Sequence, residues 1–400
     1  MNLSDVFTEV AHKNLVAVDL PNSGSHQHEL NGVAALKGLF GTDAETRGRI
    51  SWHCFTDDQE PTQEDNAFSF YDARAKTADK TGRSEWRFYY YGKFLSCGRV
   101  GDLLVLVRSA ADRYYGLIFQ SGSAWQRAAQ ELFGLRECGA SFDTIPRRTL
   151  DSQRFELLRQ QILAELDLGL DLPVAASDEE LMLKQFGRTF PTTREMAAFA
   201  RTQVETDFRR TDETLGRWLE REEQLFRALE NVIIRERLVK NFATVDEFIQ
   251  YSLSVQNRRK SRMGFALQNH LAELFTRLGL RFTPQARTEA SNKPDFIFPG
   301  ELEYHDATFN ATLLVMLGVK STCIDRWRQV LTEADRITQK HLCTLEAGIS
   351  TKQTDEMRRQ QLTLVVPMGL HSTYTTNQLQ QMLCVAEFVK LVSDRQSKEA

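Results

Sequence analysis

The sequence predicts a multidomain protein in which a β-rich domain comes first and an α/β domain follows. Residues 1 to about 135 contain short apolar runs, among them NLVAVDL, DLLVLVR and YYGLIF, separated by turn-forming residues. Short strands at this spacing are typical of a small barrel or sandwich with a helix or two packed on it. Residues 246–400 instead alternate amphipathic helical stretches with apolar runs, which indicates an α/β core.

The composition narrows the class of protein. The 54 acidic and 50 basic residues leave a net charge of −4, so a nucleic-acid site must be a local patch. No apolar run approaches the ~18 residues of a membrane helix, and the N-terminus lacks a signal-peptide core. The six cysteines are scattered without a CxxC pair, as expected of reduced thiols. We therefore expect a cytoplasmic protein with no membrane partner.

The predicted elements follow one another in a simple order. Turn-rich sequence places a linker at 166–185, between a domain of 1–165 and a domain of 186–400. Helical periodicity from about 190 to 245 indicates a bundle-like helix or a dimerisation element. Beyond it, we expect a helix in FALQNHLAELFTRLG, strands in DFIFP, TLLVMLGVK and LTLVVP, and a helix in RWRQVLTEADRIT.

Two strand ends of the α/β domain carry the residues of a hydrolytic site. NKPDFIFP places Asp295 directly before one strand, and TLLVMLGVK ends another at Lys320. Asp295 would bind Mg²⁺ through oxygen, and the ion would acidify a bound water and neutralise phosphate charge. Lys320 would orient that water or stabilise charge on the phosphorus. The PD-(D/E)XK pattern has a second carboxylate two residues before the lysine, where this chain has Gly318.

Two other groups can complete such a metal site. Glu333 falls in the predicted helix after the second strand and reaches back if that helix packs on the strand. The backbone carbonyl of Val319 is the other candidate ligand. The alternative is a buried strand followed by an exposed helix, with Lys320 and Glu333 only solvated.

From Val245 to about Leu370 the chain closely resembles the catalytic domain of the EcoRII-type (type IIE) restriction endonucleases of the PD-(D/E)XK superfamily. The resemblance implies a restriction-endonuclease-like fold with Asp295, Lys320 and Glu333 as its active site. Tyr304 matches a further residue implicated in that site, and the alternative is a half-buried structural tyrosine. The resembling stretches are VDEFI, SVQNRRKSRMG, NKPDFIFP, YHDATF, VKSTCIDRWRQVLTEADRI, HLCTLEAGIS and LTLVVP.

The stretch after Lys320 corresponds to the family's base-reading segment, which carries a basic residue, an acid and an arginine. Asp325 and Arg326 supply the last two: a carboxylate accepts from cytosine N4, and an arginine donates to guanine O6 and N7. Ile324 stands where the family has the basic residue, and Arg328 is a candidate to replace it. The alternative for Asp325 and Arg326 is a helix N-cap with a surface salt bridge.

The helix before Asp295 also departs from the family and carries a basic stretch. Relatives have glutamates on the face where this chain has Gln268 and Ala272, so an outer carboxylate is missing and activity would be weaker or depend on one metal ion. The preceding QNRRKSRMG forms either a phosphate clamp or a solvated basic turn. Its basic residues are Arg258, Arg259, Lys260 and Arg262.

The N-terminal domain has a candidate DNA-facing strand. Arg83, Glu85 and Arg87 are two residues apart and share one face of a strand. Residues 71–113 hold nine basic and five acidic residues, a local basic excess. The alternative is a solvent-facing strand with cross-strand ion pairs. The region resembles, more weakly, the effector-DNA-binding pseudobarrel of the same family, which implies DNA contacts by His26, Lys80, Arg83, Glu85 and Arg87.

The family resemblance implies a function for the whole chain. It implies a prokaryotic, homodimeric, Mg²⁺-dependent type II endonuclease that cuts double-stranded DNA at a short C/G-rich site, similar to CC(A/T)GG or changed by Ile324. The N-terminal domain would bind a second copy of the site and block the catalytic cleft until it is occupied, which is allostery. Two alternatives remain: a DNA-binding regulator with a degenerate nuclease fold, and a metal-dependent repair or structure-specific nuclease.

Overall fold

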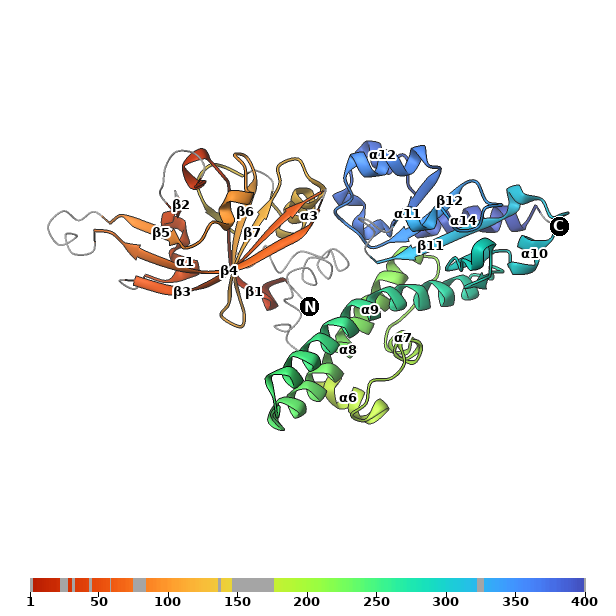
Figure 1. Ribbon diagram of the computed structural model, residues 1–400, viewed down its shortest axis with the longest axis horizontal. Helices are drawn as coiled ribbons and strands as arrows, with labels where there is room; N and C mark the ends of the chain where they lie inside the picture. Colours follow the sequence, from red (N-terminus) through yellow and green to blue (C-terminus); the bar gives the residue numbers. More distant parts are fainter. Residues whose placement is uncertain are drawn as a thin grey trace. The chain divides into compact units, whose positions relative to one another are not determined.

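The computed structural model describes residues 3–21, 28–30, 33–42, 45–57, 59–74, 84–135, 138–145, 176–321 and 327–398. The described elements form two compact units (Figure 1), one running from β1 to β8 and the other from α6 to α14. Each unit has its own sheet.

The N-terminal unit is built on one curled, eight-stranded sheet in the order β2–β5–β4–β3–β7–β6–β1–β8. Neighbouring strands are antiparallel, except that β3 and β7 run parallel. The β-rich architecture that the short apolar runs predict is therefore confirmed. The strands are β1 (Phe7–Asn14), β2 (Glu29–Leu30), β3 (Glu45–Thr56), β4 (Gln59–Asp72), β5 (Trp86–Tyr90), β6 (Leu103–Ser109), β7 (Tyr114–Phe119) and β8 (Asp143–Thr144).

Aromatic side chains fill the core of this sheet. The ring of Phe40 lies 4.9 Å from that of Phe68 and 5.0 Å from that of Phe88, centroid to centroid, and such pairs add to the energy of simple burial. Phe40 ends the short helix α1 (Lys37–Phe40), and a longer helix, α3 (Ala124–Phe133), follows β7. Ser123 caps the N-terminus of α3, where its hydroxyl accepts the Gln126 N–H, and Gly134 caps the C-terminus.

The C-terminal unit contains a five-stranded mixed sheet in the order β13–β12–β11–β10–β9. Strands β11, β12 and β13 are parallel, whereas β9 and β10 are antiparallel to their neighbours. The three apolar runs predicted as strands form β10, β11 and β13, so the expected α/β core is confirmed. The strands are β9 (Thr283–Pro284), β10 (Phe296–Phe298), β11 (Val315–Lys320), β12 (Lys340–Thr344) and β13 (Leu362–Val365).

Two long helices, α8 (Thr211–Val239) and α9 (Val245–Arg277), lie side by side beside this sheet. The helix predicted in residues 265–279 is correct at its C-terminal end, where Gly279 has φ +73°. It is far longer than predicted, because the basic stretch at 257–262 is also helical. The other helices are α6 (Ala176–Phe186), α7 (Thr193–Thr202), α10 (Glu301–His305), α11 (Trp327–Val330), α12 (Thr351–Arg359), α13 (Thr376–Leu379) and α14 (Val385–Gln396).

Helix α6 overlaps the second half of the predicted linker. The two terminal guanidinium nitrogens of Arg221 in α8 donate to Asp178, each at 2.8 Å, and Met182 packs into the same apolar cluster as Leu225. Residues 176–185 are therefore part of the C-terminal unit. The first half of the predicted linker lies outside the described residues.

The helix predicted in RWRQVLTEADRIT is wrong beyond Val330. Helix α11 spans only Trp327–Val330, and a series of turns follows it. Ala334 has φ +54°, a left-handed conformation that cannot continue a right-handed helix. Glu333 therefore projects from a turn rather than from a helix.

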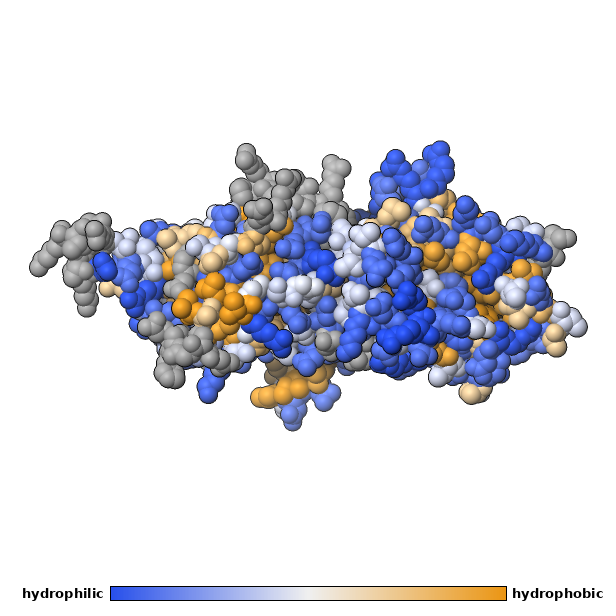
Figure 2. All heavy atoms as spheres, turned by 90° about the horizontal axis from the view of Figure 1, so that it is seen from above, coloured by the Kyte–Doolittle hydropathy of each residue, from blue (hydrophilic) through white to orange (hydrophobic). Residues whose placement is uncertain are grey.

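The surface is mostly hydrophilic on the face shown in Figure 2, with scattered apolar patches. None of the described helices is long and apolar enough to span a bilayer. Several exposed apolar side chains belong to the ends of α8 and α9 on either side of the turn that joins them. They are Leu238, Val239, Val245, Phe248, Ile249 and Leu253.

Candidate active site

Asp295 lies immediately before β10 and is almost fully buried, with 7% of its surface exposed. The N–H of Val319 donates to its Oδ2 at 2.6 Å, because β10 and β11 pair antiparallel with Phe296 opposite Leu317. Lys320, at the end of β11, places Nζ 3.9 Å from the same oxygen. Burial raises the pKa of Asp295, and Lys320 and the Val319 N–H oppose that rise.

Gly318 explains why the usual second carboxylate is absent. A Cβ at this position would lie 3.0 and 3.1 Å from the two methyl carbons of Val330, closer than side chains normally pack. The glycine thus lets α11 approach β11. That close approach carries the turn after α11, with Glu333, to the same end of the sheet as Lys320.

Glu333 is electrostatically part of this site. Burial and the negative charge of Asp295 raise the pKa of Glu333 to about 7, against the opposing charges of Lys320 and Lys340. Its Oε2 is buried and has no hydrogen-bond partner among the described residues. Most buried carboxylate oxygens accept a hydrogen bond or bind an ion, so this oxygen is a candidate cation ligand.

The side chains of Asp295 and Glu333 are chemically suited to bind a hard divalent cation. Asp295 and Glu333 offer carboxylate oxygens, the ligands that Mg²⁺ prefers, and one of these oxygens is buried with no donor among the described residues. The set is small, because the described residues contain no group of three or more Asp, Glu, His or Cys side chains arranged around a metal position.

Tyr304 lies in α10, and its described contacts connect it to Glu289 and Arg336. Its hydroxyl donates to Glu289 at 2.6 Å, and the Asp335 N–H donates to the same carboxylate at 3.1 Å. The backbone N–H of Arg336 donates to the Tyr304 hydroxyl at 3.4 Å. Burial and Glu289 raise the pKa of Tyr304. These bonds hold the turn that carries Glu333, so the contacts favour a positioning role over a catalytic one.

Replacing Tyr304 by phenylalanine is therefore expected to reduce cleavage by about tenfold or less and to leave the pH dependence of cleavage unchanged. Loss of one hydrogen bond to a charged group costs roughly 1.5–3 kcal/mol of folding free energy, which urea unfolding would measure. A loss of cleavage beyond about 10³-fold without a change in stability would instead show that the hydroxyl takes part in the reaction.

Comparison with protein families now identifies the domain that holds this site. Residues 226–389, which include Asp295, Lys320 and Glu333, match the family described as EcoRII C terminal. The site therefore lies in a stretch that is similar to the C-terminal domain of EcoRII.

Individual relatives agree with this assignment. The chain is 40% identical over 223 residues to the type II restriction enzyme EcoRII of Escherichia coli, across 55% of this chain and 55% of that protein. It thus matches about half the length of that curated relative.

Two solved structures are more distantly similar. One is metal-depleted Ecl18kI in complex with uncleaved, modified DNA, with 17% identity and a TM-score of 0.45 over 56% of this chain and 86% of that one. The other is the complex of the restriction endonuclease PspGI with substrate DNA, with 14% identity and a TM-score of 0.41 over 57% and 95%. The family match, not these weaker likenesses, carries the assignment.

Of the predicted base-reading segment, only Arg328 lies among the described residues. Ile324, Asp325 and Arg326 lie outside the described residues. Arg328, in α11, is half-exposed and donates to both oxygens of Glu356, at 2.9 and 3.1 Å. Arg328 would have to exchange this ion pair for a base contact.

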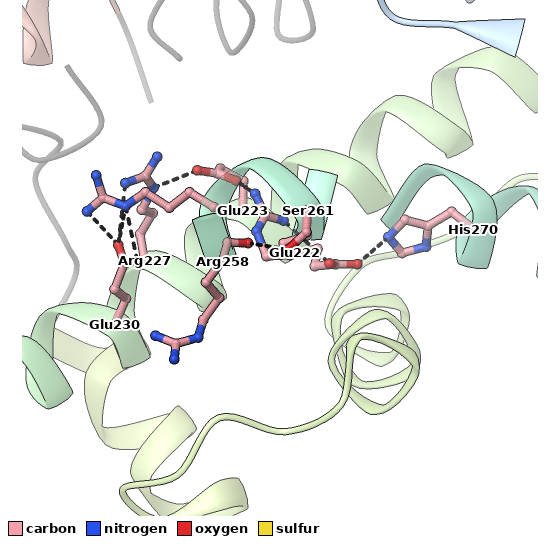
Figure 3. Close-up of polar contacts among 9 residues, drawn as sticks. Glu222, Glu223, Arg227, Glu230, Arg258, Ser261 and His270 are labelled. Carbon is pink, nitrogen blue, oxygen red and sulfur yellow. Dashed lines mark hydrogen bonds and ion pairs between the residues drawn. The ribbon is translucent and has the colours of Figure 1, made fainter. Parts of the chain in front are cut away.

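Two arginines of the basic stretch of α9, Arg259 and Arg262, form ion pairs with glutamates of α8. Arg259 donates to Glu230 of α8 at 2.7 Å, and Arg262 pairs with Glu222 and Glu223 (Figure 3). Arg258 points away from this cluster and lies 4.1 Å from the ring centre of Phe190.

These contacts correct the prediction of a phosphate clamp for two of its four residues. The sequence shows a run of basic residues without an acid, but the acids come from another helix. Arg259 and Arg262 neutralise buried glutamates, because an isolated buried charge is costly. The side chain of Lys260 lies outside the described residues.

Replacing Arg262 by methionine is expected to destabilise the C-terminal unit by about 3–5 kcal/mol, because two glutamates would lose a buried partner. Arg258→Met is the matched control from the same helix and should cost about 1 kcal/mol or less. Urea unfolding at pH 7 would measure both. Equal stability of the two variants would contradict the structural role of Arg262.

Two of the N-terminal candidates, Glu85 and Arg87, belong to a cluster of ion pairs. Glu85 accepts from Arg87 and from Arg74, each at 2.7 Å, and Arg87 also lies 3.4 Å from Glu29. This matches the alternative of cross-strand ion pairs and leaves DNA contact by Glu85 and Arg87 a prediction. The other predicted contacts, His26, Lys80 and Arg83, lie outside the described residues.

Two residues near Asp295 and Glu333 are absent from the sequence-based prediction. Gln285 donates to Asp295 at 2.9 Å, and Glu289 holds the Glu333 turn through Tyr304 and Asp335. Both precede Asp295 in an irregular segment without periodicity. Only the pairing of β9 with β10 brings Gln285 to Asp295, so the sequence offers no local signal for it.

Proposed function

We propose that this protein is a Mg²⁺-dependent, type II site-specific endonuclease of the EcoRII type that acts on double-stranded DNA. The observation that carries the proposal is the meeting of Asp295, Lys320 and Glu333 within an EcoRII C-terminal domain, with Glu333 Oε2 buried and unpaired among the described residues. Action on DNA at C/G-rich sites and a cytoplasmic location in a prokaryote belong to the same proposal.

The proposed reaction is hydrolysis of a phosphodiester. Asp295 and Glu333, with the Val319 carbonyl as a further candidate, would hold the ion, which when bound supplies a more acidic water and charge neutralisation. Lys320 stabilises negative charge on the phosphate as water adds to phosphorus. The bond from phosphorus to the 3′ oxygen breaks, that oxygen takes up a proton, and the phosphate stays on the 5′ end.

Plasmid cleavage separates this proposal from its main rival, a DNA-binding regulator with a degenerate nuclease fold. The wild-type protein should cut with Mg²⁺ and stay inactive with EDTA. The proposal fails if wild type and Lys320→Ala are equally inactive while both bind DNA. The rival is favoured by Gln268 and Ala272 of α9, neither of which supplies a carboxylate.

We further propose that the N-terminal unit is an effector-DNA-binding pseudobarrel that blocks the catalytic cleft until a second site binds, and that the chain works as a homodimer. The curled sheet supports the first idea, and the exposed apolar residues around the α8–α9 turn support the second. Adding a short duplex with the target site should stimulate cleavage of a one-site plasmid. A scrambled duplex is the control, and equal stimulation by both would refute the allosteric part.

A further inference from the structure

Two glutamine side chains meet on one oxygen of Asp295. Gln268 reaches it from α9 with Nε2 2.6 Å from Oδ1, and Gln285 reaches it from the end of β9 with Nε2 2.9 Å away. A carboxylate oxygen accepts hydrogen bonds and cannot donate them, so each amide presents its NH₂ group and not its carbonyl. Oδ1 is thereby satisfied without any cation.

The second oxygen of Asp295 is only partly used. Oδ2 accepts the Val319 N–H at 2.6 Å, whereas Lys320 Nζ at 3.9 Å is beyond hydrogen-bond length. A carboxylate oxygen has about two acceptor directions, so Oδ2 keeps one open. A further open carboxylate oxygen of the site is Oε2 of Glu333, which is buried and without a partner among the described residues.

The glutamines also limit the negative charge of the site. Asp295 and Glu333 contribute two negative charges when ionised, Lys320 contributes one positive charge, and Gln268 and Gln285 contribute none. The N–H ends of both amides, which are the positive ends of their dipoles, point at Oδ1. A cation at that oxygen would meet these positive ends, and the described residues place no third carboxylate there to neutralise it.

We propose that Gln268 and Gln285 restrict this site to a single divalent cation, bound through Asp295 Oδ2 and Glu333 Oε2. The two amides occupy Oδ1 and hold the aspartate in position before the ion arrives. This inference rests on the proposed metal-dependent function. It specifies the charge of the metal site and the number of cations that the site binds.

The test counts bound Mn²⁺ ions on the full-length chain without DNA, by calorimetric titration with electron paramagnetic resonance of free Mn²⁺ as a second readout. Wild type should bind one ion per chain. Gln268→Glu places a carboxylate beside Oδ1 and should add a second ion or tighten binding at least tenfold. Gln268→Met, of similar length but without donor or charge, should still bind one ion, at equal or weaker affinity.

The outcomes separate the two proposals. Two ions on the wild type, or one ion at unchanged affinity on Gln268→Glu, would overturn the role of the glutamines. Asp295→Asn tests the metal site itself: if it binds Mn²⁺ as tightly as wild type, or if wild type binds none, the proposed function fails as well. Gln285→Glu makes the same test from β9 and replaces Gln268→Glu if that variant does not fold.

Discussion

Replacing Lys320 by alanine is expected to reduce the rate of DNA cleavage by ~10²–10³-fold or more, the usual effect of removing one charge-stabilising donor. Lys320 is held at the end of β11 with its ammonium 3.9 Å from Asp295 and a quarter of its side chain exposed. Its charge is therefore placed beside the carboxylate that would hold the ion. Cleavage of a labelled duplex under single-turnover conditions measures the loss.

DNA binding by Lys320→Ala should stay within about threefold of wild type, because the predicted base contacts come from other residues. Lys293→Ala is the matched control: this exposed lysine lies two residues before Asp295, so its loss tests the effect of one positive charge near the site. Cleavage at the wild-type rate by Lys320→Ala, or an equal loss in both variants, would contradict the assigned role.

Replacing Glu333 by glutamine is expected to abolish cleavage and to stabilise the metal-free protein at alkaline pH. The pKa of Glu333 is about 7 in the folded protein, against 4.5 for an ordinary glutamate. Between these values the folded protein holds a proton that the unfolded chain has lost, so the ionisation of Glu333 costs stability progressively as pH rises from 4.5 to 7. Above pH 7 the full cost is present.

The expected gain from Glu333→Gln at pH 8 is about 1–2 kcal/mol, given ~1.4 kcal/mol per pKa unit and solvent screening of a half-buried carboxyl. The gain should vanish near pH 4. Urea unfolding in EDTA at both pH values measures it, with Glu301→Gln in α10 as the control. A variant that is less stable than wild type at pH 8 would show that Glu333 is not held as an unpaired charge.

The same carboxyl should shape the pH dependence of wild-type cleavage. Glu333 binds a cation only when it has lost its proton, so cleavage at limiting Mg²⁺ should fall about tenfold for each pH unit below about 7. A raised Mg²⁺ concentration should shift this midpoint to lower pH. A flat profile between pH 5.5 and 8 would exclude Glu333 as a ligand.

Much of the fold could be predicted from the sequence, because both domains follow simple patterns. The strands before and after the site are continuous apolar runs, and Asp295 and Lys320 lie at their ends, so the order of residues along the chain already indicated their meeting. The helix predicted to carry Glu333 was wrong, because Ala334 adopts a left-handed conformation that no local pattern marks. The position of Glu333 close to the site depends instead on the close approach of Val330 to Gly318, which has no side chain.

The rest of the site depends on contacts between elements far apart in the chain. Gln285 and Glu289 stand in irregular sequence and gain their roles only from the pairing of β9 with β10 and from the packing of α10. The basic run of α9 looked free because the glutamates that neutralise Arg259 and Arg262 lie about 30 to 40 residues earlier, in α8. A local pattern of charge cannot show a partner on another helix.

Sequencing the ends of genomic DNA after digestion with Mg²⁺ tests most directly whether Asp295, Lys320 and Glu333 form the site of a sequence-specific nuclease. Wild type should leave 5′-phosphate ends at one short C/G-rich sequence, and Lys320→Ala should leave none above background. Ends at unrelated sequences, ends that follow DNA structure rather than sequence, or identical ends from both proteins would contradict it.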